Sequence, residues 1–176
     1  MIRTIPVALL AVVLSAATAS AATLSGHGTA DVVWVAGAPA PAPVALQMHN
    51  QDKSFMPALV VIPEGSSVQF PNDDPFYHSI YSSDGPDHFD IGYYKDGPGK
   101  VVPFPKAGVV HVRCHIHAFM QGTIVVAGGP YTMLMNDEFS MALPAGQYTL
   151  HAVYSDGSER TLEVKLGAAD RSVTLP

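Results

Sequence analysis

The sequence predicts an all-β fold, and three features of the chain after its first twenty residues support that prediction. Short runs rich in Val and Tyr alternate apolar with polar residues, which is the period of a half-buried strand. Proline and glycine, 15 of each, separate these runs every few residues. Helical periodicity is almost absent. Together these features favour a sandwich or barrel of short strands.

The expected strands fall into two groups, separated at Gly128-Gly129-Pro130. Those of the first group are 29–35, 44–49, 58–62, 67–70, 78–82, 100–104, 109–114 and 123–127. In the second group, 147–154 and 159–166 flank a turn at Asp156-Gly157, a pair that tolerates the positive φ of a tight hairpin. The second group is too short to bury a core of its own, so we expect it to pack on the first group.

The first residues have the features of an export signal. Arg3 supplies a positive charge, residues 5–14 are mostly apolar, and Ala19-Ser20-Ala21 is a small-residue cleavage site. The apolar run is short for a membrane span, so a retained anchor is the less favoured alternative. We therefore expect a signal peptide at 1–22, a first domain at 23–127 and a small C-terminal β extension at 128–176. The mature chain should carry no membrane anchor.

The net charge of the chain limits the kinds of macromolecule that it can bind. The formal net charge is −6, and loss of Arg3 would make the mature chain one unit more negative. A surface of this sign argues against nucleic acid and favours a basic protein partner.

Cys114 is the single cysteine, so it cannot form an internal disulfide. An exposed free thiol is easily oxidised outside the cytoplasm, whereas a bound metal ion would give the sulfur a stable role.

Four potential metal ligands form the most informative pattern in the chain. Cys114, His117 and Met120 follow one another at three-residue spacing, and His78 lies upstream. A thiolate, two imidazoles and a weak axial thioether are the ligands of a blue-copper electron-transfer site. Alternation in the expected strand 109–114 places the thiol on the inward face, opposite the charged residues. We therefore predict one copper ion bound by His78, Cys114, His117 and Met120.

These residues resemble the cupredoxins. The similarity covers about residues 51 to 126, including the segment 68–74, and the short Cys-His-Met loop is most like amicyanin and the methylamine-utilisation cupredoxins of the bacterial periplasm. The resemblance implies a Greek-key β-sandwich with a type 1 copper site. It also implies a periplasmic electron carrier with redox protein partners, a dehydrogenase as donor and a cytochrome as acceptor. Residues 143–150 resemble a carboxypeptidase-regulatory-like β module.

Two positions depart from the amicyanin-like pattern. Ser79 follows His78 where those proteins have Asn, which puts in doubt a hydrogen bond that supports the site. His115 follows Cys114 where a small or polar residue is usual. Alternation turns His115 away from the metal, so we expect it near the surface, with competition as a ligand as the alternative.

Other metal-binding patterns are weaker. Met133 and Met135 could form a copper(I) thioether patch, but alternating strand methionines more often face a core. Asp84, Asp87 and Asp90 lack the glycine and glutamate pattern of an EF-hand, so we expect a solvated acidic loop and not a calcium site.

The expected function is single-electron transfer by a monomer, without catalysis. Periplasmic copper binding or trafficking without redox turnover is the alternative, and a structural zinc ion could also use the thiolate and the imidazoles. A multicopper oxidase needs several His-x-His pairs, and this chain has one, at His115 and His117. A dinuclear copper site needs two cysteines. The sequence contains no nucleophile elbow, phosphate loop or metalloprotease motif.

Overall fold

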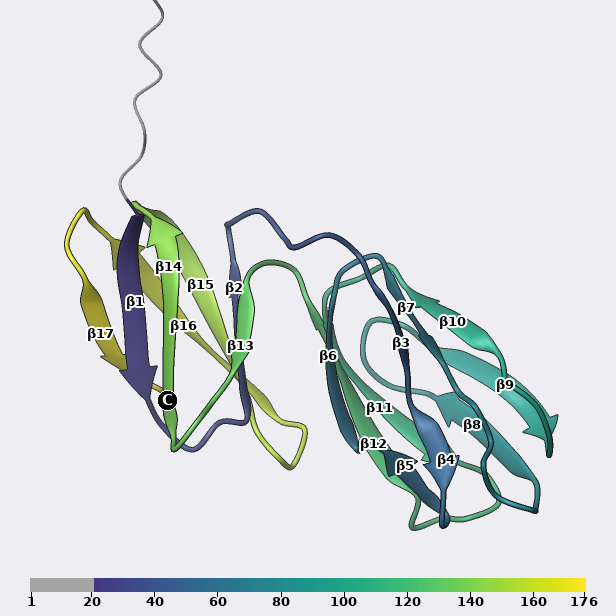
Figure 1. Ribbon diagram of the computed structural model, residues 1–176. Helices are drawn as coiled ribbons and strands as arrows, with labels where there is room; N and C mark the ends of the chain where they lie inside the picture. Colours follow the sequence, from purple (N-terminus) through teal and green to yellow (C-terminus); the bar gives the residue numbers. More distant parts are fainter. Residues whose placement is uncertain (1–20) are drawn as a thin grey trace, which may run out of the picture.

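The computed structural model describes residues 21–176, so the expected signal peptide lies outside the described residues except for Ala21 and Ala22. These residues form 17 strands in five sheets, and no helix occurs between residues 21 and 176. This part of the chain accordingly has no apolar helix of membrane-spanning length. The all-β prediction is confirmed. Figure 1 shows the strands gathered into two β-sandwiches that lie side by side.

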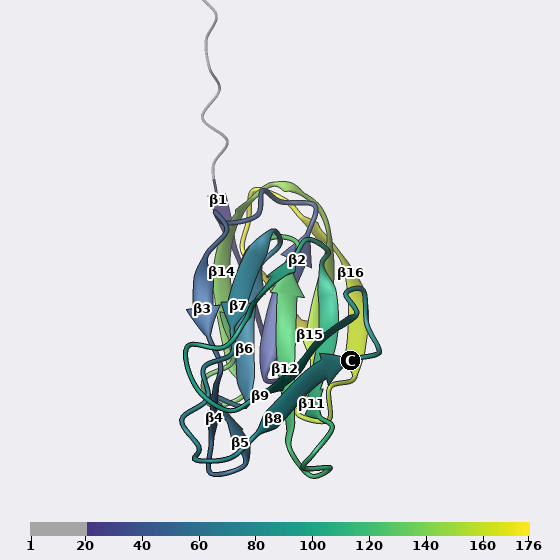
Figure 2. The same cartoon turned by 90° about the vertical axis from the view of Figure 1, so that its right-hand side faces the viewer.

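The first sandwich contains a three-stranded sheet in the order β10-β7-β3, a five-stranded sheet in the order β6-β12-β11-β8-β9, and the hairpin β4-β5. In Figure 2 this sandwich faces the viewer. Its strands are β3 (Ala45–Gln47), β4 (His49–Gln51), β5 (Ser54–Met56), β6 (Leu59–Pro63), β7 (Ser66–Gln69), β8 (His78–Ser82), β9 (Phe89–Tyr94), β10 (Val101–Phe104), β11 (Gly108–Cys114) and β12 (Gln121–Ala127).

Alternation along β11 orients its side chains as the sequence predicts. Val110, Val112 and Cys114 are buried in the apolar core of the first sandwich, and the residues between them are half-buried on the other face. β11 is an inner strand that pairs antiparallel with β12 on one side and with β8 on the other. Its last residue, Cys114, stands opposite Ile80 of β8. The end of β11 is therefore held by a core and by a neighbouring strand.

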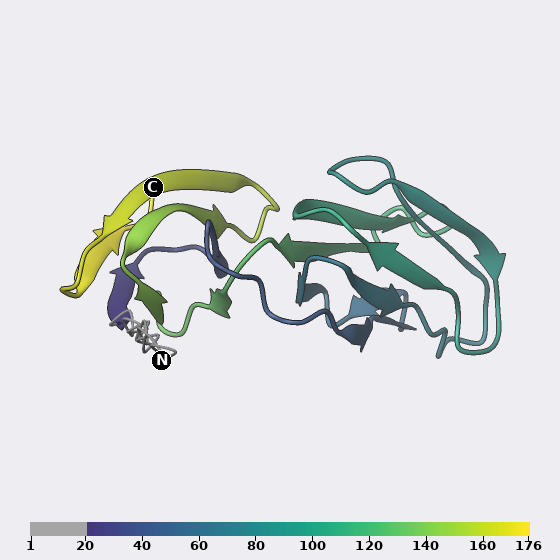
Figure 3. The same cartoon turned by 90° about the horizontal axis from the view of Figure 1, so that it is seen from above.

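The second sandwich is built from both ends of the described chain. Its sheets have the orders β14-β1-β17 and β13-β2-β15-β16. Figure 3 shows the first and last strands together at one end of the molecule. Its strands are β1 (Ala21–His27), β2 (Val32–Ala36), β13 (Tyr131–Met133), β14 (Glu138–Pro144), β15 (Gly146–Val153), β16 (Glu159–Leu166) and β17 (Arg171–Thr174).

This strand pairing differs from the expected domain boundaries of 23–127 and 128–176. β1 and β2 hydrogen-bond to strands that lie beyond Gly128, and not to those of the first sandwich. With their help the C-terminal strands enclose an apolar core of their own, which includes Leu24, Val33 and Leu150. The expectation of a small extension counted only the residues after Gly128, and it missed the two strands that the N-terminal segment supplies.

A third apolar cluster joins the two sandwiches. Trp34 of β2, which is 4% exposed, packs in one cluster with Val125 and Ala127 of β12. The indole also stacks on the imidazole of His151, with ring centroids 3.7 Å apart and planes 13° apart. Large aromatic side chains dominate the energetics of such contacts because they bury the most apolar area. The contact covers part of the outer face of the five-stranded sheet, around the C-terminal half of β12.

Replacing Trp34 with Ala should therefore destabilise the protein by about 3–5 kcal/mol, because it leaves a cavity between the two sandwiches. Urea unfolding of the wild type and the variant measures this loss. Met133→Ala, at an exposed position of the same sheet, is the control and should change stability by less than about 0.5 kcal/mol. Equal unfolding midpoints for the wild type and Trp34→Ala would contradict the assigned role.

Candidate metal centre

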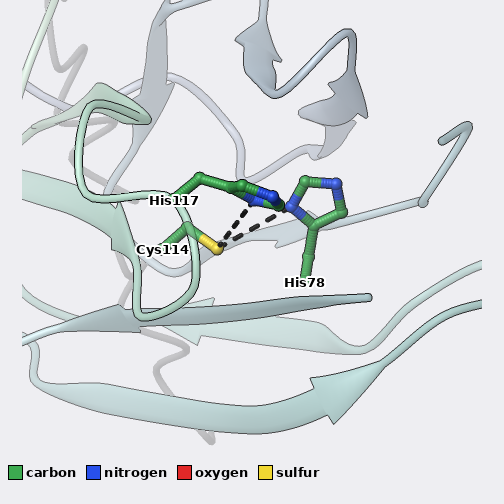
Figure 4. Close-up of side chains that lie close together, drawn as sticks. All are labelled: His78, Cys114 and His117. Carbon is green, nitrogen blue, oxygen red and sulfur yellow. Dashed lines mark hydrogen bonds between the residues drawn. The ribbon is translucent and has the colours of Figure 1, made fainter. Parts of the chain in front are cut away.

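Three of the four predicted ligands meet at one end of the first sandwich. The Sγ atom of Cys114 lies 3.7 Å from Nδ1 of His78 and 3.9 Å from Nδ1 of His117 (Figure 4). All three candidate ligand atoms lie within 4.8 Å of one another, and both His78 and Cys114 are buried. Sulfur and nitrogen ligands bound to one ion at about 2.0–2.3 Å are separated by similar distances. The cluster can hold a single small metal ion.

The strands and the following turn position these side chains. His78 is the first residue of β8 and Cys114 the last residue of β11, and these two strands are neighbours in the sheet. The backbone N–H of His115 donates to the carbonyl oxygen of Ser79 at 2.9 Å, which continues the contact past the end of β11. The turn then closes as the N–H of Met120 donates to the carbonyl of His117 at 2.8 Å.

Met120 lies in the apolar core beside the cluster. It is 1% exposed and belongs to the same group of packed side chains as Cys114 and Phe55. It directly precedes β12, the strand that pairs with β11. A buried thioether next to a buried thiolate suits a soft metal. The donor set of two imidazoles, one thiolate and this thioether fits one type 1 copper ion, and axial ligation by Met120 stays a prediction.

A carboxylate that the sequence analysis did not assign to the site contacts His78. Nε2 of His78 donates to Oδ2 of Asp74 at 2.9 Å, and both side chains are buried. Burial raises the pKa of Asp74, but hydrogen bonds from Lys53 N–H, the His78 ring and Asp52 N–H outweigh it and hold the pKa below its usual value. The carboxylate is therefore ionised at neutral pH. In the sequence analysis Asp74 appeared only as the last residue of the segment 68–74, which resembles the cupredoxins, and no role was assigned to it.

His117 is the predicted ligand nearest the surface. Its ring lies edge-on to Phe76 at 5.5 Å between centroids and 6.1 Å from the ring of Phe119. Phe119 is 70% exposed, and Ile116 in the same turn is also exposed. Burial lowers the pKa of His117, and the nearby His78 and Lys53 side chains lower it further. A neutral imidazole is the form that binds a metal.

His115 lies outside the cluster. Its ring stacks on Tyr81 with centroids 3.9 Å apart and planes 8° apart, and its Nε2 lies 3.1 Å from Oδ2 of Asp90. Both contacts are on the outer face of the sheet. The side chain therefore points away from Cys114, as alternation along the strand predicts.

The expectation that Met133 and Met135 face a core is wrong. They are 53% and 74% exposed, whereas Leu134 between them packs against the core of the second sandwich. β13 is an edge strand of its sheet, and Met135 lies two residues beyond its end. Alternation gives the faces of a strand correctly but does not reveal which face is covered.

The aspartates of the acidic loop contact protein groups. Asp84 accepts a hydrogen bond from the guanidinium of Arg113 at 2.8 Å, and Asp87 accepts one from the N–H of Lys106 at 3.3 Å. Among residues 21–176, no cluster of metal-binding side chains includes them. The calcium alternative gains no support from these contacts.

Comparison with known proteins gives similarities to solved structures only. No protein-family model and no curated protein sequence matches this chain. A copper-containing nitrite reductase from Thermus scotoductus SA-01 is 28% identical with a TM-score of 0.47, over 53% of this chain and 25% of that one. A purple cupredoxin from Nitrosopumilus maritimus is 24% identical with a TM-score of 0.43, over 47% and 99% of the two chains. A reduced amicyanin variant is 19% identical with a TM-score of 0.44, over 53% and 97%.

These similarities are to cupredoxins and to an enzyme that contains copper. Each covers about half of this chain, and the chain spans a quarter of the length of the nitrite reductase. The expected likeness of residues 143–150 to a carboxypeptidase-regulatory-like module is untested by these matches.

Ser79 supports the site through its backbone and not through its side chain. Its hydroxyl is buried and has no hydrogen-bond partner within the described part of the chain, while its carbonyl accepts from His115. Replacing it with Ala removes a buried unsatisfied group, so Ser79→Ala should be neutral or slightly stabilising. Thermal unfolding and the copper spectrum measure this. A large loss of stability or a changed spectrum would show that the hydroxyl has a role after all.

Proposed function

We propose that this protein is a type 1 copper protein of the periplasm that carries single electrons between redox proteins. The observation that carries the proposal is the buried cluster of His78, Cys114 and His117 at one end of the first sandwich. Copper bound there supplies a one-electron Cu(II)/Cu(I) couple. The buried Cys114 and His78 side chains shield one side of the site from water, and Met120 is the axial ligand in this proposal.

The surface around His117 gives electrons a short route to a partner. The ring of His117 is partly exposed, and the exposed apolar side chains of Ile116 and Phe119 flank it. An exposed apolar patch is typical of a site where a protein partner docks. The formal charge of −6 favours a basic partner, with association that weakens as salt increases. A dehydrogenase donor and a cytochrome acceptor are the partners implied by the amicyanin resemblance.

The location is proposed from the sequence alone. An export signal at 1–22 would release the mature chain into the periplasm, as a monomer without a membrane anchor. Removal of residues 1–22 would leave most of β1 in the mature protein, including the buried Leu24. The proposed cleavage would therefore leave strand pairing partners for β14 and β17 in the mature protein.

The proposed role is that of a carrier and not of an enzyme. The four ligand positions are all taken by protein groups in this assignment, so no open position remains for a substrate. The activity of the similar nitrite reductase is not transferred, since this chain corresponds to only a quarter of its length.

Copper trafficking without redox turnover is the second candidate. The exposure of Met133 and Met135 favours it, because surface thioethers bind copper(I). Transfer of copper to a chelator and the rate of electron self-exchange separate the two functions. An electron carrier should keep its copper and exchange electrons rapidly, whereas a trafficking protein should release copper readily and exchange electrons slowly.

Adding Cu(II) to the mature protein should produce an intense thiolate-to-copper charge-transfer band and narrow EPR hyperfine splitting. Cys114→Ser should abolish both, because the single cysteine supplies the thiolate. Ser79→Ala serves as the matched control and should keep the band. A wild-type protein that stays colourless after copper loading would refute the ligand assignment, and it is the result expected for a zinc site. An unchanged spectrum in Cys114→Ser would also refute the assignment.

Met120→Leu should keep the blue colour and make the reduction potential more positive. Loss of the thioether removes a ligand that stabilises Cu(II), while the thiolate and imidazoles remain. Leu has nearly the volume of Met, so the buried position should accept it at a cost below about 1.5 kcal/mol. Voltammetry of the two proteins measures the reduction potential. An unchanged potential would show that Met120 is not a copper ligand.

A further inference from the structure

A cleft of about 400 Å³ lies between the two sandwiches, beside the apolar cluster that joins them, and shares Leu59 and Val153 with that cluster. We propose that this cleft binds a lysine or arginine side chain of a protein partner, with the carboxylate of Asp31 as its counter-charge. The identity of the partner as a redox protein rests on the proposed function. The residues that line the cleft include none of the proposed metal ligands.

The floor of the cleft is the outer face of β11 and β12. In this antiparallel pair His111 stands opposite Thr123. Arg113 stands opposite Gln121. Side chains that stand directly opposite each other lie on the same face of a sheet, so this row points away from the core of the first sandwich. Arg113 and Gln121 also flank the segment 114–120, which carries the proposed ligands Cys and His. One end of the cleft therefore lies at the base of the ligand turn.

The second sandwich supplies the opposite wall. Its residues in the cleft are Asp31, which precedes β2, Val153 at the end of β15, and the hairpin residues 154–156. The hairpin approaches the floor so closely that a Cβ atom added to Gly157 would lie 2.0 Å from Cε1 of His111. Figure 3 shows the turn between β15 and β16 extending toward the first sandwich. The cleft is thus bounded by both sandwiches, and it exists only because they are packed together.

The charges that line the cleft favour a cation. Arg113 donates to Asp84 at 2.8 Å, so its positive charge is balanced within the protein. Asp31 is half-buried in the cleft, and its Oδ2 atom is buried without a hydrogen-bond partner among residues 21–176. A carboxylate oxygen that has lost water without gaining a donor is costly to the fold. A cation bound beside this carboxylate would offset that cost.

A second carboxylate in the cleft belongs to Asp156, which is exposed. Hydrogen bonds from Ser158 hold the pKa of Asp156 below its usual value, and the charge of Arg160 lowers it further. Asp156 therefore adds negative charge but already has a cation near it, which leaves Asp31 as the main counter-charge. No group of three potential metal ligands within the described part of the chain includes either carboxylate, so an organic cation is favoured over a metal ion.

The remaining lining groups suit the stem of a basic side chain. Leu59 and Val153 provide apolar surface, and Thr123 provides a hydroxyl group on the floor. Lysine and arginine pack their methylene groups on apolar surface while the charged end stays near polar groups. The formal charge of −6 favours a basic partner in general. A partner that docks on the ligand turn beside Phe119 can place such a side chain in the neighbouring cleft.

Proton–nitrogen NMR of the metal-free protein tests the cleft without copper. At least one of the N-acetyl methylamides of lysine and arginine should shift the amide signals of Thr123 and Tyr154 to saturation, whereas the uncharged norleucine compound should not. Asp31→Asn should weaken this binding by about tenfold, as expected for the loss of a charge-assisted hydrogen bond. Asp96→Asn, at an exposed residue outside the cleft, makes the same change of charge and should bind as the wild type does. Equal shifts with the norleucine compound, or no shifts with any of the three, would overturn the proposal.

Electron transfer to a basic c-type cytochrome tests whether a protein partner uses the cleft. In the copper-loaded protein, Asp31→Asn should lower the second-order rate constant at low salt more than Asp96→Asn does, and high salt should remove the difference. Equal rate constants for the two variants would show that only net charge matters, and would overturn the docking role. A wild type without the charge-transfer band would refute the proposed copper function, and the NMR result would still decide whether the cleft binds a basic side chain.

Discussion

The antiparallel pairing of β8 with β11 is the constraint on which the metal centre depends. It brings together an imidazole and a thiol that are 36 residues apart in the chain. Strand side chains alternate between faces, so a shift of one residue in this register would turn Cys114 out of the core. Val110 and Val112 on the same face oppose such a shift, because it would expose them as well. The apolar core and the metal cluster are therefore specified by the same alternation.

Hydrogen bonds hold the parts of the proposed site that strand pairing does not position, which are the turn after β11 and the ring of His78. The turn after β11 is anchored by His115 to β8 and closed between His117 and Met120. On the opposite side of the cluster, Asp74 connects the His78 ring to the backbone of the β4–β5 turn. The side chains of the proposed ligands thus have their arrangement without a bound ion. A preorganised site of this kind suits a centre that must rearrange little between two oxidation states.

The sequence predicted the local parts of this arrangement and missed the non-local ones. Spacing and alternation identified Cys114 and His117, and a strand start identified His78, because these signals lie within a few residues. The role of Asp74 depends on contacts with a turn about twenty residues upstream, which no local pattern reveals. The pairing of β2 with β15 likewise joins distant segments, so the extent of the second sandwich could not be read from residues 128–176.

The second sandwich limits the directions from which the site can be approached. The C-terminal half of β12 is buried on both faces, by the first core at Ile124 and by the Trp34 cluster at Val125. The outer face of the sheet is therefore covered at the end far from the proposed ligands, where the strand pair that leads into the ligand turn is held. The turn itself stays free, with Phe119 exposed beside the His117 ring. A protein that exchanges electrons with the proposed centre thus has its shortest approach through this turn, and the two-sandwich arrangement leaves that approach open.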